Sequence, residues 1–377
     1  MKIVFVSNVL NHHQLSFCQN LCELCDSFFF IATDPSEEGH GYQSTIESNF
    51  VIHWFDAEQR HLAEEEIIKA DAVIFGACPS ELISLRMKCN KLSFFYAERF
   101  FKKGTWRRFI PTTYKKVYNS LLQYRNKRMY VLAASAYLPY DLSLLYFPLG
   151  KIYKWGYFPE LREHENTEEL IGKKNPHSIV WVARFIDWKH PETAISIAKR
   201  LKSDGYDFEI NLIGNGELFG KISEAVKIEQ LGNNVRLLDS MKPEQVREYM
   251  EKSEIHIFTS DRNEGWGAVL NESMNSACVP VANKAIGSVP YLINDGNNGF
   301  MYKDENELYE KVKYLLNNDK DRKAMAKRAY DTISTKWNAK VAAERFVETA
   351  KRLLNGENII TYDDGPCCFS KVIKDNW

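Results

Sequence analysis

A segment in the second half of the chain, residues 259–272, combines acidic side chains with glycines in a way that suits a sugar ligand. Two glutamates stand eight positions apart, Glu264 and Glu272, and Gly265 and Gly267 lie between them. A carboxylate accepts two hydrogen bonds, so each glutamate could hold a pair of vicinal hydroxyls. Glycines let the backbone approach a ligand without a side chain in the way. Such glutamate pairs also arise by chance on a solvated helix, but the apolar strands expected on both sides favour a site.

The same segment also predicts a phosphate-binding site. It follows an apolar run that ends at Phe258, and we expect a helix to begin near Trp266. The N-terminus of a helix presents free amide groups and the positive end of the helix dipole, both of which attract phosphate. The segment therefore combines groups that could bind a phosphate with groups that could bind sugar hydroxyls.

Two cations follow the first expected strand of the second half. Arg184 comes directly after that strand, and Lys189 precedes the next helix. A fork-shaped guanidinium and a compact ammonium together could neutralise a diphosphate. Surface Arg and Lys are common, so this pair gains weight only from its association with the glutamate segment.

Two further glycines, Gly214 and Gly216, resemble the start of a dinucleotide fingerprint. The third glycine, Gly220, comes one position too late for the G-x-G-x-x-G pattern, and the preceding strand is not the first of its domain. A nicotinamide or flavin enzyme is therefore poorly supported. A tight turn beside a base or ribose fits these glycines better.

These segments need a scaffold of parallel sheets. Short apolar runs alternate with amphipathic stretches, as in β-α-β units, and a polar stretch at 160–176 separates two series. We predict two doubly wound α/β domains, 1–159 and 160–355, with a cleft at their carboxyl edges, and a tail, 356–377, that packs back on the first domain. The expected strands are 2–6, 27–31, 50–52, 72–75, 92–96 and 130–133 in the first series, and 178–182, 208–213, 235–238, 255–258 and 279–282 in the second.

Bulk properties agree with a globular protein in a reducing compartment. The 377 residues, 45% apolar and 26% charged, suffice for two cores. The eight cysteines lack the spacing of a disulfide or zinc framework. The N-terminal apolar run is too short for a signal peptide, and no run reaches the length of a membrane span. These features predict a cytoplasmic protein.

In order and spacing, the segments around Arg184, Gly214, Glu264 and Gly287 resemble glycosyltransferase family 4. The resemblance is close over residues 178–300 and implies a retaining glycosyltransferase of the GT-B fold, with two Rossmann-like domains facing across a cleft. The first domain would take the acceptor and the second the nucleotide sugar. The first glutamate of the family's E-x7-E motif would contact the transferred hexose and the second the donor ribose, while Arg184 and Lys189 would bind the diphosphate. Loop amides would face the phosphates and the sugar, here those of Trp266, Gly267, Ala268, Val269 and Leu270.

The acceptor side departs from the family. The glycine-rich loop that many members carry after their first strand is replaced here by Asn8 to Gln14, and a family histidine is replaced by the stretch around Glu98. His12, His13 and Glu98 are our candidates for binding acceptor hydroxyls or donor phosphate. Exposed loop histidines are common without any such role.

Residues 97–140 are rich in both basic and aromatic side chains, and no acidic residue occurs between Arg99 and Tyr140. This composition suits the surface of an anionic membrane, on which the protein could be peripheral at the inner face, or simply a solvated basic helix. No nucleic-acid-binding module is recognisable. A dock for a lipid-linked saccharide acceptor is the hypothesis that follows.

We expect neither a metal nor another cofactor beyond the nucleotide sugar itself. The D-x-D triplet at Asp319 and Asp321 opens a polar helix and is interpreted as surface. Two other functions stay open: a catalytically silent scaffold that binds nucleotide sugars, and a sugar-nucleotide epimerase on the same fold.

Overall fold

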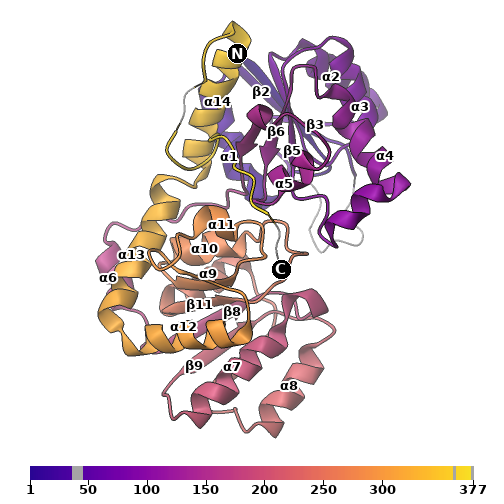
Figure 1. Cartoon of the computed structure of the whole chain (residues 1–377). Coiled ribbons are helices and arrows are strands. Elements are labelled where there is room, and N and C mark those ends of the chain that lie inside the picture. The colour runs from indigo at the N-terminus through magenta and orange to yellow at the C-terminus, as the bar shows by residue number, and fades with distance from the viewer. Residues whose placement is uncertain (36–45, 360–361, 375–377) are drawn as a thin grey trace. The chain divides into compact units, whose positions relative to one another are not determined.

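The computed structural model describes residues 1–35, 46–359 and 362–374, and these divide into two compact units (Figure 1). Unit 1 comprises Met1–Glu160 and the described chain from Trp337 onward, and unit 2 comprises Leu161–Lys336. Each unit is built on one parallel sheet with helical crossovers. The predicted fold class, two Rossmann-like α/β domains, is confirmed.

The sheet of unit 1 has the strand order β3-β2-β1-β4-β5-β6-β7. Its central strands are buried along most of their length because helices cover both faces, which explains their continuous apolar sequences. The strands are β1 (Lys2–Ser7), β2 (Ser27–Ala32), β3 (Val51–His53), β4 (Ala72–Phe75), β5 (Ser93–Ala97), β6 (Met129–Ala133) and β7 (Ile152–Lys154). The helices are α1 (His12–Leu24), α2 (Ala57–Lys69), α3 (Ser80–Lys88), α4 (Pro111–Ser120), α5 (Leu138–Ser143) and α14 (Ala339–Asn355), with a 3-10 turn, η1, at Thr105–Phe109.

The last long helix belongs to unit 1, not to the second domain as expected. Phe346 of α14 packs against the rings of Phe17, Phe94 and Trp155, with centroids 6.3, 4.9 and 5.9 Å away. The expected second domain, 160–355, therefore ends too late, and unit 2 stops at Lys336. Helical periodicity predicted α14 correctly but gave no sign of which core its apolar face joins.

The end of the chain contacts the edge strand β7. The amide of Lys154 donates to the carbonyl of Cys368 at 2.7 Å, and the ring of Tyr153 lies 5.1 Å from that of Phe369. This strand, like β13 in unit 2, has three residues and was not predicted from the sequence. Three residues are too few to show a period, so β7 and β13 were missed, whereas β3, of the same length, was predicted as 50–52.

The sheet of unit 2 has the order β10-β9-β8-β11-β12-β13. Its strands are β8 (Ser178–Val182), β9 (Glu209–Ile213), β10 (Val235–Leu238), β11 (Ile255–Phe258), β12 (Val279–Asn283) and β13 (Phe300–Tyr302). Its helices are α6 (Thr167–Gly172), α7 (Pro191–Ser203), α8 (Phe219–Ile228), α9 (Pro243–Lys252), α10 (Val269–Asn275), α11 (Val289–Leu292), α12 (Glu305–Asn317) and α13 (Asp319–Thr335). All five strands predicted for this half are present.

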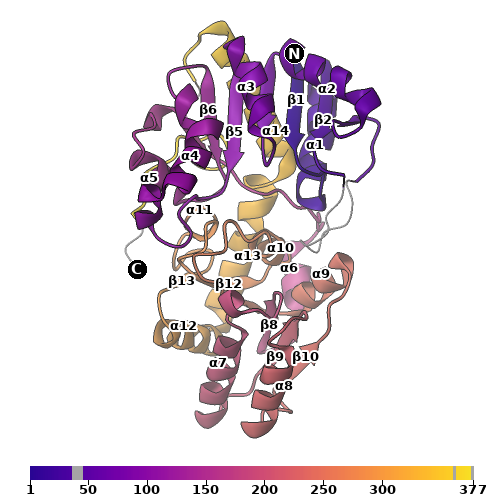
Figure 2. The ribbon, with the colours of Figure 1, turned by 90° about the vertical axis from the view of Figure 1, so that its right-hand side faces the viewer.

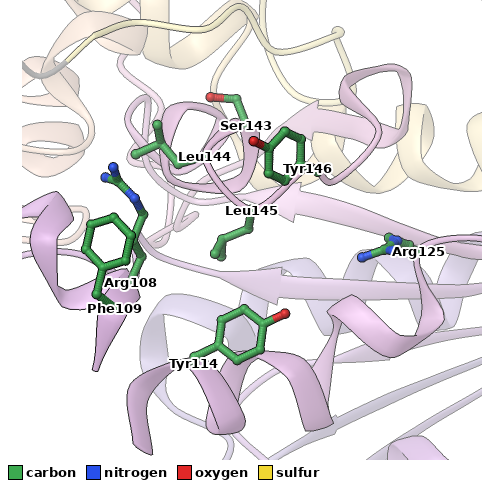
Figure 3. Close-up of a pocket in the computed structure, with 8 residues that line it drawn as sticks. All are labelled: Arg108, Phe109, Tyr114, Arg125, Ser143, Leu144, Leu145 and Tyr146. Atoms are coloured by element: carbon green, nitrogen blue, oxygen red, sulfur yellow. The ribbon is translucent and has the colours of Figure 1, made fainter. Parts of the chain in front are cut away.

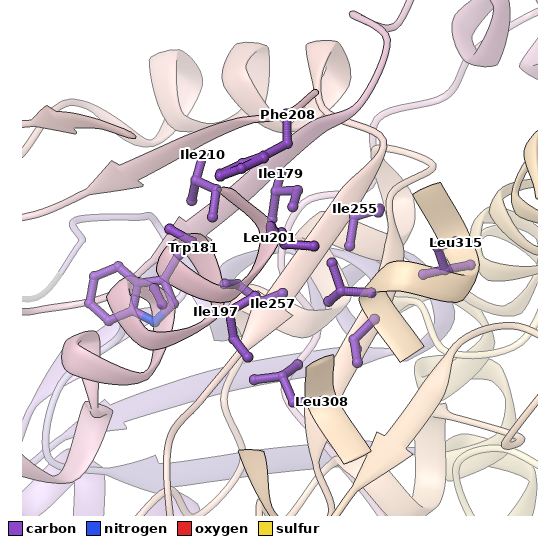
Figure 4. Close-up of a cluster of buried hydrophobic side chains, with 14 of the residues drawn as sticks. Ile179, Trp181, Ile197, Leu201, Phe208, Ile210, Ile255, Ile257, Leu308 and Leu315 are labelled. Atoms are coloured by element: carbon purple, nitrogen blue, oxygen red, sulfur yellow. The ribbon is translucent and has the colours of Figure 1, made fainter. Parts of the chain in front are cut away.

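Alternate residues of β8 face two separate cores in unit 2. Ile179 and Trp181 pack with Ile197 of α7 and Leu308 of α12 (Figure 4). Val180 belongs to a smaller cluster on the other face of the sheet. Figure 2 shows α7 and α8 side by side next to β8 and β9. The sheet is thereby covered on both faces, which leaves its carboxyl edge and the loops there for a ligand.

Candidate functional site

The direction of winding reverses within the sheet of unit 2. From β8 the chain proceeds outward through β9 and β10, and then returns to the other side of β8 with β11, β12 and β13. Doubly wound sheets bind ligands beyond the carboxyl ends of the strands where this reversal occurs, here β8 and β11. Arg184 and Lys189 follow β8, and Glu264 follows β11. The predicted cations and the first glutamate therefore come from the two loops that flank the switch point.

The structure joins two of these predicted residues directly. The Lys189 ammonium forms an ion pair with Glu264, and the Ser260 hydroxyl donates to the same carboxylate oxygen at 3.1 Å. The Lys189 and Glu264 side chains are only 13% and 12% exposed. The ammonium also lies 4.3 Å from the centroid of the Trp188 ring. A largely desolvated pair of this kind holds both charges in a fixed place.

Backbone contacts tie the two loops together beneath this ion pair. The Thr259 hydroxyl donates to the carbonyl of Lys189 at 2.6 Å and accepts from Nε1 of the buried Trp181 at 2.7 Å. The amide of Asp261 donates to the carbonyl of Trp188 at 3.1 Å. The position of the ammonium is thus set by the strand ends and not by the ion pair alone.

Arg184 differs from Lys189 in having no partner. Its side chain is exposed and makes no hydrogen bond or ion pair with any residue that the structure describes. An unpaired guanidinium at this edge keeps all its donors for a ligand and can bind two phosphate oxygens at once.

The glycine loop reaches its helix later than expected. Helix α10 begins at Val269, not near Trp266, because Gly267 has a φ of +87°, which is not helical. A Cβ at Gly267 would lie 2.6 Å from the Phe258 ring, so the position has room only for glycine. Within the described chain, the amides of Gly267, Ala268 and Val269 have no acceptor, while that of Leu270 bonds to the Gly267 carbonyl.

Trp266 has its side chain in the core. Its ring is fully buried, and Nε1 donates to Asn271 at 2.9 Å. Its carbonyl accepts from the amide of Ser288 at 3.3 Å, and the Glu264 carbonyl accepts from Gly287 at 3.2 Å. The loop after β12 therefore braces the glutamate loop, a role for Gly287 and Ser288 that the sequence did not reveal.

Gly214 and Gly216 let two neighbouring loops approach each other. A Cβ at Gly214 would lie 2.0 Å from the carbonyl oxygen of Ala183, and one at Gly216 would lie 2.5 Å from that of Phe185. The φ angle of Gly214 is +140°. Their observed contacts are with the loop that carries Arg184, so the structural role of these glycines is to let that loop pack closely against the loop after β9.

Glu272, the second glutamate of the motif, lies in α10 and not in the loop that carries Glu264. It is in the first turn of α10, and burial raises the pKa of its carboxyl, an effect opposed by the charges of Arg247 and Arg162. Arg247 is held in place by Asn275, which accepts from it at 2.6 Å. These two arginines keep a positive field beside Glu272.

One further cation near the site was missed. His190 follows Lys189, and its imidazole lies 3.6 Å from Asp261 and 2.9 Å from Glu192. Hydrogen bonding to Asp261, supported by Glu192, raises the pKa of His190 to about 9. The imidazole is therefore protonated at neutral pH. Its position next to Lys189 and two residues before Glu192 was the available signal, but only the fold brings Asp261 to it.

The three acceptor-side candidates are connected within unit 1. His12 and His13 open α1, with ring centroids 3.8 Å apart, and His13 stacks on Tyr157 at 6.0 Å. The Tyr157 hydroxyl donates to Glu98 at 2.6 Å, and Lys102 donates to the other oxygen of Glu98, also at 2.6 Å. Tyr157 was missed because nothing in its local sequence marks it.

The D-x-D triplet is engaged in contacts of the surrounding helices. Asp319 pairs with Arg322 at 2.7 Å and with Lys323 at 2.9 Å, and Asp321 accepts from the Tyr314 hydroxyl. These contacts are those of a helix surface. The expectation that the reaction needs no metal stays a prediction.

Comparisons with known proteins identify the segment that carries these loops. Residues 163–332 match the family model of glycosyl transferases group 1. Trehalose synthase of Pyrococcus horikoshii is 27% identical over 187 residues, which cover 46% of this chain and 44% of that protein. The amylovoran biosynthesis glycosyltransferase AmsK of Erwinia amylovora is 25% identical over 185 residues, 47% of this chain and 45% of AmsK. The matched region thus spans less than half the length of either relative.

Two solved structures share the fold over nearly the whole chain. HepE of Anabaena, crystallised with UDP, superposes with a TM-score of 0.71 at 13% identity and covers 93% of this chain and 100% of that one. A glycosyltransferase of Rickettsia africae gives a TM-score of 0.65 at 17% identity, with coverage of 94% and 99%. In the part of the chain that the structure describes, no helix is both long and apolar enough to span a bilayer.

Proposed function

We propose that the chain transfers a hexose from a nucleoside diphosphate sugar to an acceptor hydroxyl with retention of configuration, starting from the match of residues 163–332 to the family model of glycosyl transferases group 1. The observation that carries the proposal is the Lys189–Glu264 pair with the unpaired Arg184 at the switch point of the second sheet. A diphosphate needs fixed cations, and a hexose needs a carboxylate that accepts two hydrogen bonds. Both are present at one edge.

The reaction breaks the bond between the anomeric carbon and a diphosphate oxygen. Negative charge then grows on the leaving phosphate, and Arg184 and Lys189 are positioned to stabilise it as it develops. The acceptor hydroxyl forms the new bond on the same face, and its proton passes to the leaving phosphate oxygen. Glu264 would hold the hexose and Glu272 the ribose. Lys189 would contact Glu264 and the diphosphate together, which aligns the sugar with its leaving group.

Uridine diphosphate sugars are the first donors to test, because the related HepE was crystallised with UDP. Assembly of a cell-surface polysaccharide or glycolipid at the cytoplasmic side of the membrane is the setting that we propose. This part rests on the partial similarity to AmsK, an amylovoran biosynthesis glycosyltransferase.

The test is a transfer assay on the full chain. A thermal-shift screen with UDP, GDP, ADP and their sugars first selects the donor, since a ligand that binds the native state raises the melting temperature. Release of the nucleoside diphosphate together with a glycosylated product, whose anomeric configuration is read by NMR, supports the proposal. A changed sugar still attached to its nucleotide would indicate an epimerase, and binding without turnover across saccharide acceptors would indicate a silent scaffold. Either result overturns the proposal.

A further inference from the structure

Unit 1 carries a cationic surface that the transfer site does not use. The stretch from Arg99 to Tyr140 contains no acidic residue, and the acid that ends it, Asp141, is fully buried and paired with the equally buried Arg99 at 3.1 Å. The acid that precedes it, Glu98, is bonded to Lys102 and Tyr157. Of the other cations, Lys103, Lys115, Lys116 and Arg125 are exposed and Arg107 and Arg108 are half-buried, and the stretch itself supplies no carboxylate to pair with them.

Large aromatic side chains are exposed among these cations. Phe109 is 73% exposed, Trp106 59% and Tyr146 87%, and Phe109 and Tyr146 line one pocket. Tyr146 also has a φ of +56°, a costly conformation for an aromatic residue. We name this region the basic-aromatic surface; it comprises Lys103, Trp106, Arg107, Arg108, Phe109, Tyr114, Lys115, Lys116, Tyr118, Arg125 and Tyr146.

A cavity of about 630 Å³ opens within this surface. Arg108 and Phe109 from η1 lie on one side of it and Arg125 on the opposite side, with Leu145 between them, and Tyr114 of α4 also lines it (Figure 3). Two cations together with apolar side chains suit an anionic headgroup attached to hydrocarbon.

The scaffold under the surface is rigid. The buried Asp141 carboxylate accepts from the amide of Phe101 at 2.9 Å as well as from Arg99, which fixes the chain just before η1. Val117 anchors α4 in the core, and the Tyr124 hydroxyl lies 2.8 Å from that of Ser84 on α3. The exposed aromatics are thus presented by ordered elements and not by a loose loop.

We propose that the basic-aromatic surface docks the protein on the face of an anionic phospholipid bilayer, with a lipid phosphate between Arg108 and Arg125. Aromatic rings favour the headgroup level of a membrane, and basic side chains are attracted to anionic lipids. Leu144 and Leu145 line the cavity beside Arg108 and Arg125 and offer apolar contact to an acyl chain, which favours lipid over nucleic acid. The inference goes beyond the proposed transfer and does not depend on it.

The test is sedimentation of the full chain with vesicles of phosphatidylcholine alone or mixed with phosphatidylglycerol. We expect binding to the anionic vesicles only, at least about tenfold stronger than to neutral ones, and release by salt. Inorganic phosphate and a single-stranded RNA oligonucleotide are added as competitors at constant low ionic strength, and neither should displace the protein. Equal binding to both vesicle types, no binding, or displacement by either competitor overturns the proposal.

Two variants and a control locate the surface. Phe109→Ser with Tyr146→Ser, and Arg108→Gln with Arg125→Gln, should each reduce binding by about tenfold or more. Ile228→Ser, which removes a comparably exposed apolar side chain (69% exposed) from unit 2, should have no effect. Because all five positions lack core packing, the variants should fold, and circular dichroism checks this. Wild-type binding by both double variants would assign the docking to another surface.

Discussion

Two cationic regions of the chain hold their charges in opposite ways. At the switch point of unit 2, the Lys189 side chain is 13% exposed and pairs with Glu264. The backbone carbonyl of Lys189 accepts a hydrogen bond from the Thr259 hydroxyl. On the basic-aromatic surface, Arg108 donates to the nearby Thr105 carbonyl at 3.2 Å and lies 4.4 Å from the centroid of the Phe109 ring, and Arg125 is exposed. A fixed, partly desolvated charge suits one small ligand in one geometry, whereas solvated charges suit a broad and variable partner. The same residue types therefore point to different ligands according to how the fold holds them.

Removing the fixed charge should have the largest effect. Lys189→Ala takes away a cation that would stabilise the leaving diphosphate, and we expect the transfer rate to fall by about 10²–10³-fold. Single-turnover kinetics with saturating donor measure this. Lys199→Ala is the matched control. Lys199 forms an exposed ion pair with Glu229, with 2.8 Å between the charged atoms, on α7 and outside the proposed site. A rate for Lys189→Ala equal to that of the control would contradict the account.

The packing between the loops after β8 and β9 can be disrupted without changing any charged residue. Gly214→Ala would place a methyl group 2.0 Å from the carbonyl oxygen of Ala183 at a φ of +140°, so we expect a loss of roughly 3 kcal/mol in the free energy of unfolding. Gly220→Ala is the control, since its Cβ meets nothing within 4 Å in α8 and should stabilise by about 0.5–1 kcal/mol. Urea unfolding distinguishes the two. Similar midpoints would mean that the two loops are not packed as described.

Arg184 lies at the same sheet edge as Lys189 but is exposed, so it separates the effect of position from that of burial. Arg184→Ala should weaken the binding of the nucleoside diphosphate by about 1.5–3 kcal/mol, the contribution of a charged hydrogen bond. Arg184→Lys keeps the charge but loses the fork, so an intermediate affinity is expected. Isothermal titration calorimetry provides the values. If alanine and lysine bind as tightly as arginine, the guanidinium does not contact the diphosphate.

The smallest effect concerns pH. The folded pKa of His190 is about 9, above its ordinary 6.5, so its stabilising contribution is fully present below pH 6.5 and is lost as the pH rises through 9. Diphosphate affinity should decline over the same range, because a positive charge next to Lys189 disappears. His190→Gln should flatten this decline while leaving the affinity at high pH nearly unchanged. A decline of equal size in the variant would assign it to another group.

The sequence predicted those parts of the molecule that depend on local pattern. Apolar runs and helical spacing gave every strand of four or more residues, and the motif around Glu264 and Glu272 pointed to the edge where Arg184 and Lys189 also lie. Contacts between distant segments were not predictable in this way. The pairing of β7 and β13, the contact of Asp261 with His190, and the place of α14 in unit 1 all follow from such contacts.

Two further predictions, the start of α10 and the number of solvated cations in the basic stretch, were wrong because tertiary contacts decide both. Helix α10 starts only at Val269 because Gly267 has a positive φ, which is not helical. The Phe258 ring lies so close to Gly267 that no side chain fits there. Arg99 was counted with the basic stretch, yet it is fully buried against Asp141. Composition alone cannot separate a buried, paired cation from a solvated one.

The most direct test of the account is a crystal structure of the full chain soaked with a nucleotide sugar such as UDP-glucose. The account predicts diphosphate oxygens within hydrogen-bonding distance of Arg184 and Lys189, with the hexose on Glu264 and the ribose on Glu272. Density for the nucleotide anywhere other than the carboxyl edge of β8 and β11 would contradict it.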